Sequence, residues 1–464
     1  MKILYLHVVS LDMDKANVIQ VLNMCQAFAE LGHDVHLGVP LGKVQTDLGA
    51  RAAERLGRNS VDFSVFSYPM ITIAGRFPLI GNAVGATYKT WNLEADVVFI
   101  RHEWLLLTMA SRNRNIIFEG HNIPSLRSNR ILNSLLRRRM VAQVKRSNLR
   151  MFVTISEELR RYWSKFEVPE QKLITAHDGF RAEMFETLPS LEEARRLLCL
   201  PLNQKIVTYV GSLYEDRGIP RILSLAESFP ETLFTVVGGP MEQVKYFERK
   251  AREQGLKNLL LTGPVAHSRI PLVLSAADVL LMIWSSSVPT INYCSPLKLF
   301  EYMASGRPII ASDLPSLREI ITHEETALLV PPDDARAFAA AVERLRYDAA
   351  LARRLAANSL QMVADYTWDH RADRIIGFLS PTEYLLRLND IVNKFNTLDD
   401  YSRLTGGDIY QVGNTELEPA FPQVMEQARN QYVLTYISSN EAPSDTIVFR
   451  RIEVLSEEPY DIAH

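Results

Sequence analysis

The 464-residue sequence has few cysteines and no long apolar run, and both shortages restrict its class. Cys25, Cys199 and Cys294 lie far apart and form no CxxC pair, which excludes a disulfide framework or a zinc site of the usual spacing and predicts reduced, buried thiols. No apolar run reaches the roughly 18 residues of a membrane span. The opening MKILYLHVVSLD lacks a small-residue cleavage site, so we expect no signal peptide and a cytoplasmic protein.

A strong net charge is also absent, since the whole chain carries -3, but the charge is unevenly distributed. Residues 381–464 hold 14 acidic and six basic side chains, a net charge of -8, so the other 380 residues carry +5. We therefore predict a separate acidic accessory module over 381–464. Nucleic-acid binding is not expected, because the basic stretches carry no interleaved aromatic residues and no known binding motif.

Short apolar runs alternate with amphipathic stretches of helical length over residues 1–375, which is typical of parallel α/β sheets. The first series of predicted strands is KILYLHVV, HDVHLGVP and the segments 96–101, 115–120, 150–155 and 172–177. The pattern restarts near 185–203 and continues with KIVTYVG, TLFTVVGG, NLLLTG, DVLLMIW, PIIAS and ALLVP. Two doubly wound domains that face a cleft are predicted, with ligands outside the carboxyl ends of the strands.

The segment SPLKLFEYMASGRPIIAS, residues 295–312, places charge at the start of a predicted buried helix. Ser295 suits an N-cap and Pro296 suits the first helical position. Lys298 and Glu301 share the other face, where a solvated ion pair worth about 0.2–0.5 kcal/mol is one explanation. The alternative is that helix amides and Lys298 hold a diphosphate while Glu301 accepts hydrogen bonds from a ribose.

A second phosphate-suited segment is VTYVGSLYEDRGIPRILSLAESF, residues 207–229, which reads as strand, turn and helix. Arg217 at the helix entry can bind phosphate oxygens bidentately. It is equally explained as a solvated arginine that pairs with Glu215 or Asp216. Both segments follow strands of the second predicted domain, so they can face one ligand.

The ordered set YVGSLYEDRG, VGG, NLLLTGPVAHSRIP, AADVLLMI and SPLKLFEYMASGRPIIASDLPSLREII resembles the donor domain of retaining glycosyltransferases of family 4, which have the GT-B fold. CQAFAELGHDVHLGVP, FEGHNIPS, VTISEELRRYW and AHDGF are similar to the first domain of that family. The resemblance covers about residues 1–380. It implies Rossmann-like domains over 1–185 (acceptor) and 186–365 (nucleotide sugar), with a helix over 366–380 that returns to the first domain.

The resemblance also implies site residues. Glu301 would bind the nucleotide ribose and Arg217 the diphosphate, while His121 in EGHN would lie beside the anomeric carbon. The remaining donor-binding residues would be Gly211, Ser212, Ser295, Pro296, Leu297 and Lys298. Glu119 is a weaker catalytic candidate, equally explained as a strand-end residue paired with Arg101. Two departures stand out: Tyr293 and Ser212 occupy positions where the family often has glutamate and arginine, and Lys298 would supply the missing cation.

The implied reaction is metal-independent and needs no cofactor. A sugar would pass with retention from a nucleoside-diphosphate sugar to a glycan or lipid-linked acceptor in cell-surface polysaccharide synthesis. Two alternatives remain at this point: a nucleotide-sugar epimerase of the same fold, for which no carboxylate and histidine set is identified, and a non-catalytic assembly protein.

Residues 121–150 contain eight Lys and Arg and no acidic residue. A helix within 127–150, with Leu132, Leu135, Leu136, Met140 and Val144 inside, could lie peripherally on anionic lipid at the inner membrane face. A solvated basic face explains the same pattern.

The tail, 381–464, is predicted as helix, strand, helix and two strands. It is similar to the last third of a bacterial von Willebrand factor A-like domain, but it lacks the DxSxS metal loop of that domain. Such a partial module could dock on the transferase or dimerise.

Overall fold

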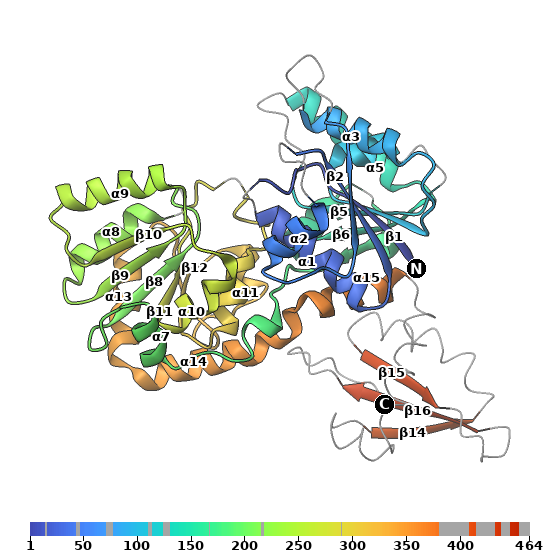
Figure 1. The fold of residues 1–464 in the computed structure, drawn as a ribbon. Helices are drawn as coiled ribbons and strands as arrows, with labels where there is room; N and C mark the ends of the chain where they lie inside the picture. Colours follow the sequence, from blue (N-terminus) through green and yellow to red (C-terminus); the bar gives the residue numbers. More distant parts are fainter. Residues whose placement is uncertain are drawn as a thin grey trace. The chain divides into compact units, whose positions relative to one another are not determined.

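The computed structural model describes twelve stretches of the chain (Figure 1). They are residues 1–13, 16–42, 47–70, 78–109, 114–123, 130–166, 168–214, 218–288, 290–379, 408–413, 432–437 and 446–453. The chain divides into two compact units, Met1–Ala372 and Asp373–His464. Each unit is described by itself below.

The first sheet of the larger unit has seven parallel strands in the order β3-β2-β1-β4-β5-β6-β7. The strands are β1 (Lys2–Leu6), β2 (Asp34–Pro40), β3 (Ser64–Tyr68), β4 (Val97–Ile100), β5 (Ile116–Gly120), β6 (Leu149–Thr154) and β7 (Leu173–Thr175). Most are continuous buried apolar runs, as expected for a sheet with both faces covered. The order reverses between β1 and β4, so the carboxyl ends of these strands mark the expected ligand site.

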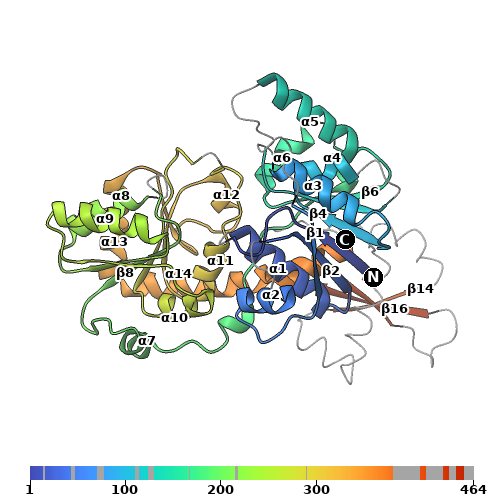
Figure 2. The ribbon, with the colours of Figure 1, turned by 45° about the horizontal axis from the view of Figure 1, so that its top comes forward.

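Helices cover both faces of this sheet, and Figure 2 shows them on either side of it. They are α1 (Ala16–Glu30), α2 (Leu48–Leu56), α3 (Pro78–Lys89), α4 (Glu103–Met109), α5 (Arg130–Val144) and α6 (Glu157–Ser164), with short 3-10 turns at Glu170–Lys172 and Ala182–Met184. Leu6 and Phe118 pack with residues of α3 to α6 on one face. On the other face Tyr5 stacks on Phe99 at 4.6 Å between ring centroids, beneath Phe28 of α1.

The second sheet has six parallel strands in the order β10-β9-β8-β11-β12-β13. The strands are β8 (Ile206–Val210), β9 (Leu233–Val237), β10 (Leu259–Gly263), β11 (Val279–Met282), β12 (Ile309–Ser312) and β13 (Leu328–Val330). The two doubly wound domains predicted from the sequence are confirmed by these sheets.

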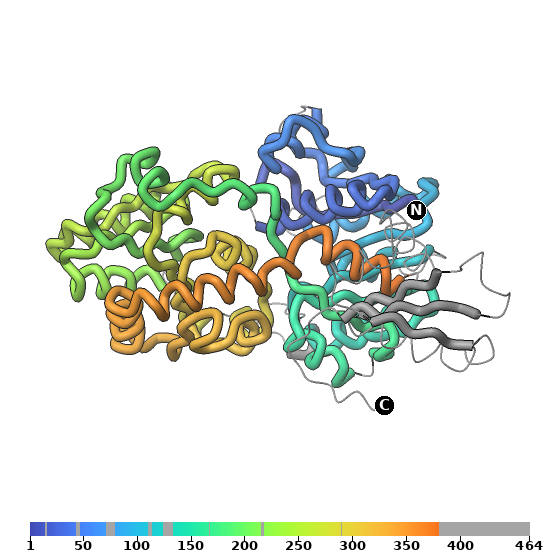
Figure 3. Tube along the Cα trace, turned by 90° about the horizontal axis from the view of Figure 1, so that it is seen from below, coloured from blue at the N-terminus to red at the C-terminus, as the bar shows by residue number. Residues whose placement is uncertain are grey.

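One face of the second sheet packs against α8, α9 and α13, and the other against α10, α11 and α12. The helices are α7 (Leu191–Leu197), α8 (Ile219–Ser228), α9 (Met241–Glu253), α10 (Ile270–Ser275), α11 (Leu297–Ala304), α12 (Pro315–Arg318), α13 (Ala335–Tyr347), α14 (Ala349–Met362) and α15 (Trp368–Leu379), with short 3-10 turns at His267–Arg269 and Val363–Tyr366. Figure 3 shows the chain of α14 leading into α15. Trp368 at the start of α15 is buried.

Three details of the larger unit differ from the expectations or extend them. The edge strand β3, sequence SVFSY, was not predicted, because its serines and half-buried positions interrupt the apolar run that marks the other strands. Cys25 is buried and Cys294 is partly buried, but Cys199 is exposed, so the expectation of three buried thiols is wrong there. On α5, Leu136, Met140 and Val144 are buried, whereas Leu135 is 50% exposed.

The smaller unit contains a three-stranded antiparallel sheet in the order β14-β16-β15. Its strands are β14 (Asp408–Gly413), β15 (Tyr432–Ile437) and β16 (Thr446–Glu453), which correspond to the three strands predicted in the tail. The two helices predicted in the tail, one before β14 and one between β14 and β15, lie outside the described residues. Within the described stretches of the chain, no helix is both long and apolar enough to cross a membrane.

Hydrogen bonds join residues that follow strands of the first sheet to loops of the second. The Ser156 hydroxyl donates to the carbonyl of Tyr293 at 2.7 Å, and the backbone N–H of Asp178 donates to the Ser295 hydroxyl at 2.9 Å. The Glu319 carboxylate accepts from the N–H groups of Glu157 and Glu158 at 2.7 and 2.8 Å, at the start of α6. Glu319 therefore supplies a carboxylate to the exposed amides of a helix N-terminus.

Candidate active site

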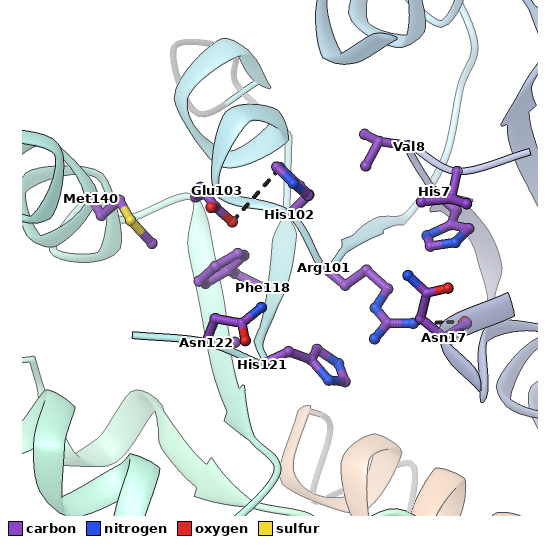
Figure 4. A pocket seen from close by; sticks show the side chains of 12 residues that line it. His7, Val8, Asn17, Arg101, His102, Glu103, Phe118, His121, Asn122 and Met140 are labelled. Atoms are coloured by element: carbon purple, nitrogen blue, oxygen red, sulfur yellow. Dashed lines mark hydrogen bonds and ion pairs between the residues drawn. The ribbon is translucent and has the colours of Figure 1, made fainter. Parts of the chain in front are cut away.

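A pocket opens at the carboxyl edge of the first sheet, where the strand order reverses. His7 follows β1, Arg101 and His102 follow β4, and His121 follows β5; all four line the pocket (Figure 4). Its empty space, including open solvent at the mouth, is about 520 Å³. Since the carboxyl ends of parallel strands share one edge, residues distant in sequence meet here.

Glu119 lies directly behind this pocket on β5. Its neighbour Phe118 belongs to the core beneath α3 to α6, and strand alternation turns Glu119 to the opposite face, under α1 and α15. The Glu119 side chain is completely buried and accepts hydrogen bonds from Gln20 Nε2 at 2.8 Å and from His121 Nε2. It also accepts from Arg371 Nη2 at 2.9 Å.

The charge of Glu119 is stabilised by these neighbours. Burial by itself raises the pKa of the Glu119 carboxyl, but Arg371 and His121 together bring that pKa well below its usual range. The carboxyl is therefore ionised, and Arg371 neutralises it. Arg371 is itself held in place, because its Nε donates to the carbonyl of His177 at 2.8 Å.

His121 is a neutral ring at physiological pH. Burial, reinforced by the positive charge of Arg101, lowers the pKa of His121 to about 4 despite the opposing effect of Glu119. The ionised Glu119 carboxylate can only accept hydrogen bonds, so the ring proton lies on Nε2. Nδ1 consequently has a free lone pair and can accept a hydrogen bond from a hydroxyl group.

The loop after β8 and the first turn of α11 form a second group of predicted site residues. Gly211 has a φ of 149°, and a Cβ atom there would lie 3.2 Å from Lys298 Nζ, so glycine permits the lysine to approach the backbone. Lys298 Nζ lies 4.1 Å from the ring centroid of Tyr209, whose hydroxyl donates to the carbonyl of Ser212 at 2.9 Å. The structure thus brings Gly211, Ser212 and Lys298 together.

Glu301 lies one turn further along α11 and is 12% exposed. Its Oε1 lies 2.5 Å from Nε2 of His267, a residue of the 3-10 turn after β10. Although burial alone lowers the pKa of His267, the Glu301 carboxylate raises it above its ordinary value. Tyr302 anchors the helix, since its hydroxyl accepts from the N–H of Val210 on β8 at 2.7 Å.

Some of the predicted local details are wrong. Ser295 is not the N-cap of α11: its hydroxyl instead accepts from Asp178, and Pro296 is in the N-cap position with an extended φ of -86° and ψ of 114°. Leu297 is the first residue of the helix. Glu119 does not pair with Arg101, because Arg371 is its ion-pair partner and Arg101 Nη1 donates to the carbonyl of Asn17.

Arg217, the predicted ligand of the diphosphate, lies outside the described residues, as do Glu215 and Asp216. Within the described stretches no group of three or more His, Cys, Asp or Glu side chains is arranged to hold a metal ion.

The sequence interpretation missed His7, His102 and Asp178. Asp178 is 5% exposed, and its Oδ1 has no hydrogen-bond partner within the described part of the chain. Burial raises the pKa of Asp178 to about 7, although Arg371 opposes this effect. A signal for His102 was present, because it directly follows the predicted strand 96–101 at the edge where ligands bind. His7 lies inside the predicted strand KILYLHVV, and only the observed end of β1 at Leu6 places it at that edge.

The comparisons with known proteins agree with this architecture. Residues 18–183 match the family model described as Glycosyltransferase Family 4, and residues 204–348 match the one described as Glycosyl transferases group 1. The first matched range contains β2 to β7 of the first sheet, and the second contains β8 to β13, the whole of the second sheet. Among curated relatives, D-inositol 3-phosphate glycosyltransferase of Corynebacterium urealyticum is 29% identical over 197 residues, which cover 40% of this chain and 45% of the relative. The chain thus spans about half the length of the curated relatives it matches.

Solved structures show the same GT-B fold at low sequence identity. Sucrose-phosphate synthase from Thermosynechococcus elongatus superposes with a TM-score of 0.66 at 20% identity, covering 82% of this chain and 98% of that chain. HepE of Anabaena in complex with UDP gives a TM-score of 0.65 at 17% identity, covering 82% and 100%. At these identities the likeness establishes the fold alone.

Proposed function

We propose that this GT-B chain is a retaining glycosyltransferase. It would transfer a sugar from a nucleoside-diphosphate sugar to a hydroxyl group of a glycan or lipid-linked acceptor, in cell-surface polysaccharide synthesis. The observation that carries the proposal is the neutral His121 ring, fixed by the buried Glu119 at the carboxyl edge of the first sheet. The family matches of both domains support the reaction class.

The donor is proposed to bind at the second sheet. Cleavage of the bond between the anomeric carbon and a diphosphate develops negative charge on the leaving group. Lys298 and the N-terminal end of α11, where the N-cap residue Pro296 makes no side-chain capping hydrogen bond, are suited to that charge. Glu301 is suited to accept hydrogen bonds from ribose hydroxyls. HepE, which shares the fold, has been solved with UDP and with UDP-glucose, and this supports the choice of donor class.

His121 is proposed to orient the donor sugar. A protonated ring would repel the positive charge that develops on the sugar in an oxocarbenium-like transition state. A neutral ring avoids this repulsion, and its Nδ1 lone pair can accept a hydrogen bond from a sugar hydroxyl. Glu119 then acts as a positioning residue, because it fixes the tautomer and orientation of the ring from behind the pocket.

Retention is proposed to occur by attack of the acceptor hydroxyl on the face that the diphosphate leaves. A covalent glycosyl-enzyme intermediate needs a carboxylate that can reach the anomeric carbon. Glu119 is fully buried and accepts three hydrogen bonds, so it is poorly placed to act as this nucleophile. The burial of Glu119 therefore supports attack by the acceptor hydroxyl on the face that the diphosphate leaves.

Peripheral contact with an anionic membrane through 127–150 is also part of the proposal. On α5, Arg138 and Arg139 are exposed beside the exposed Leu135, which suits a headgroup layer. The basic and apolar groups on one surface would hold the pocket near a lipid-linked acceptor.

The test of the proposal is incubation of the full chain with a panel of nucleoside-diphosphate sugars. Transfer, or slow hydrolysis of one donor, is expected, and NMR of the released or transferred sugar should show the anomeric configuration of the donor. His121→Asn should lower turnover by about 10²-fold or more while UDP affinity changes little. His36→Asn, a matched change on β2 away from the pocket, should leave turnover unchanged. An epimerised donor, or no affinity for any nucleoside diphosphate, would contradict the proposal.

A further inference from the structure

Arg101 brings a positive charge to the pocket, and no carboxylate of the described residues forms an ion pair with it. Its Nη1 donates to the carbonyl of Asn17 at 2.8 Å, and no acidic side chain of the described residues lies within ion-pair distance of the guanidinium. Two of the nearby acids are engaged elsewhere: Glu119 pairs with Arg371, and Glu103 lies 3.7 Å from the His102 ring. The third, Asp178, has a pKa that burial raises to about 7. A half-buried guanidinium in this situation is a ready partner for an anion.

His7 has unused hydrogen-bonding capacity at the same place. It is 2% exposed and lines the pocket, yet neither ring nitrogen has a hydrogen-bond partner in the described part of the chain. The side-chain oxygen of Asn17 is buried without a partner as well. Buried polar groups are normally satisfied, so these atoms point to a ligand that completes them.

The donors of this pocket follow two strands, since Arg101 and His102 follow β4 and His7 follows β1. His102 Nδ1 accepts from the N–H of Trp104 at 3.3 Å, so the proton of the neutral ring lies on Nε2. Burial lowers the pKa of His102 as it does that of His7, which keeps both rings neutral, each with one N–H to donate. Figure 4 shows Arg101 reaching toward Asn17, with His7 and His121 close to it.

We propose that Arg101, His7 and His102 form a subsite for the phosphate group of a phosphate-bearing acceptor. The inference rests on the proposed glycosyl transfer and adds the chemical class of its acceptor. A guanidinium fork with two imidazole N–H donors matches the several acceptor oxygens of a phosphate better than the single oxygen of a neutral sugar hydroxyl. His121, which lines the same pocket, would place the donor sugar beside the bound acceptor.

The phosphate is assigned to the acceptor because every described residue that lines the pocket belongs to the first sheet and its connections. The leaving diphosphate has its own set of groups, Lys298 and the start of α11, on the second sheet. The two anions would therefore occupy different sites and bind independently.

The test begins with inorganic phosphate and the full chain. Calorimetric titration with sodium phosphate, against sodium chloride at equal ionic strength, should show binding that is unaffected by saturating UDP. Arg101→Gln should weaken this binding by about tenfold to a hundredfold and leave UDP affinity unchanged. Arg150→Gln, the same change at an exposed position on β6, should alter neither affinity.

Two results would overturn the subsite: phosphate affinity that is equal in wild type and Arg101→Gln, or competition between phosphate and UDP. Neither result depends on transfer activity, so the subsite and the proposed function can fail separately. If no nucleoside diphosphate binds while phosphate still binds through Arg101, the proposed function fails and the anion site stands.

His7→Phe distinguishes a ligand-binding histidine from a structural one. The substitution removes both unpartnered nitrogens with a ring of similar size, so the melting temperature of the unliganded protein should stay the same or rise. Phosphate affinity should fall several-fold. An unchanged phosphate affinity would remove His7 from the subsite.

The source of the phosphate group is distinguished by two further titrations. Glucose 6-phosphate, compared with glucose, tests a soluble phosphate ester, and vesicles of phosphatidylglycerol, compared with phosphatidylcholine, test a lipid headgroup. If either ligand binds more tightly than inorganic phosphate, and if that binding depends on Arg101, the result supports an acceptor and identifies its kind. Preference for free phosphate over both would overturn the acceptor assignment.

Discussion

Arg371 of α15 donates a hydrogen bond of 2.9 Å to Glu119 of β5, and the two side chains are 2% and 0% exposed. The residues are 252 positions apart in sequence. Because Glu119 also holds the His121 ring, this buried ion pair connects the helix that follows the second sheet to the site at the edge of the first. Its removal has consequences for both stability and the site.

Arg371→Met should destabilise the protein strongly. The substitution leaves the Glu119 carboxylate buried without its counter-charge, a loss of about 3–5 kcal/mol in the free energy of unfolding. The double variant Arg371→Met/Glu119→Gln should recover part of this loss, because neither charge is then left alone. Urea unfolding measures both, with Arg161→Met at a 65% exposed position as the control. A loss below about 1 kcal/mol, the range of exposed pairs, would refute the role of this ion pair.

The pKa of His121 should respond to its two charged neighbours in opposite directions. Arg101→Gln removes a positive charge that disfavours protonation, so the pKa should rise from about 4, whereas Glu119→Gln should lower it. Ring-proton NMR titration of the variants reports both shifts. Arg150→Gln serves as the control. Equal titration curves in all the proteins would show that these charges do not act on the ring.

His121 also gives a signed dependence of stability on pH. Its pKa is about 4 in the folded chain and about 6.5 when unfolded, so the unfolded state binds more protons between these values. This contribution to stability is present above about pH 6.5 and is lost as the pH falls toward about 4. Melting temperatures of wild type and His121→Asn should therefore converge at low pH. A constant difference would contradict the lowered pKa.

Asp178 should produce the opposite slope. Its pKa of about 7 lies above the ordinary value of about 3.9, so the folded state holds a proton that the unfolded chain releases. This contribution to stability is fully present below about pH 4 and is lost as the pH rises through about 7. Asp178→Asn should flatten the profile and be the more stable protein near pH 8. Asp365→Asn, at an exposed position, should follow the wild type.

Glu301→Gln should lower the pKa of His267 below its ordinary value. The carboxylate is what raises this pKa, and burial alone, which then remains, lowers it. Titration of the His267 ring by NMR checks the shift. UDP affinity should fall by about tenfold or more if Glu301 binds the ribose, because a hydrogen bond to a charged acceptor is lost. A lowered pKa with unchanged UDP affinity would separate the observed ion pair from the proposed ribose contact.

Several parts of the site could be predicted from the sequence because they depend on local pattern. His121 directly follows an apolar run that forms β5, and Lys298 and Glu301 lie one turn apart on a helix that begins where Pro296 ends the preceding loop. Periodicity also indicates which edge of each sheet carries these residues. By contrast, the serine-interrupted β3 carries too weak a pattern to be predicted, and its place comes from pairing with β2.

The partners of the buried charged groups could not be predicted in this way. Glu119 was equally compatible with Arg101, which is close in sequence and also follows a strand, yet the fold places Arg371 against it. Ser295 looked like a helix cap, but its hydroxyl receives the N–H of Asp178. In both cases the observed partner is more than a hundred positions away in sequence and replaces the expected local partner. A local sequence pattern does not indicate which distant residue will make such a contact.

The amino-acid order by itself determined two parallel sheets, the edges at which polar residues collect, and an acidic tail with three strands, because hydrophobic periodicity and charge are properties of neighbouring residues. Tertiary structure alone decided that His121 is neutral, that Glu119 is enclosed, and that Arg101 faces the pocket without a counter-ion among the described residues. The strength of a charge interaction depends on distance and on exclusion of water, and both are set only when distant segments pack together.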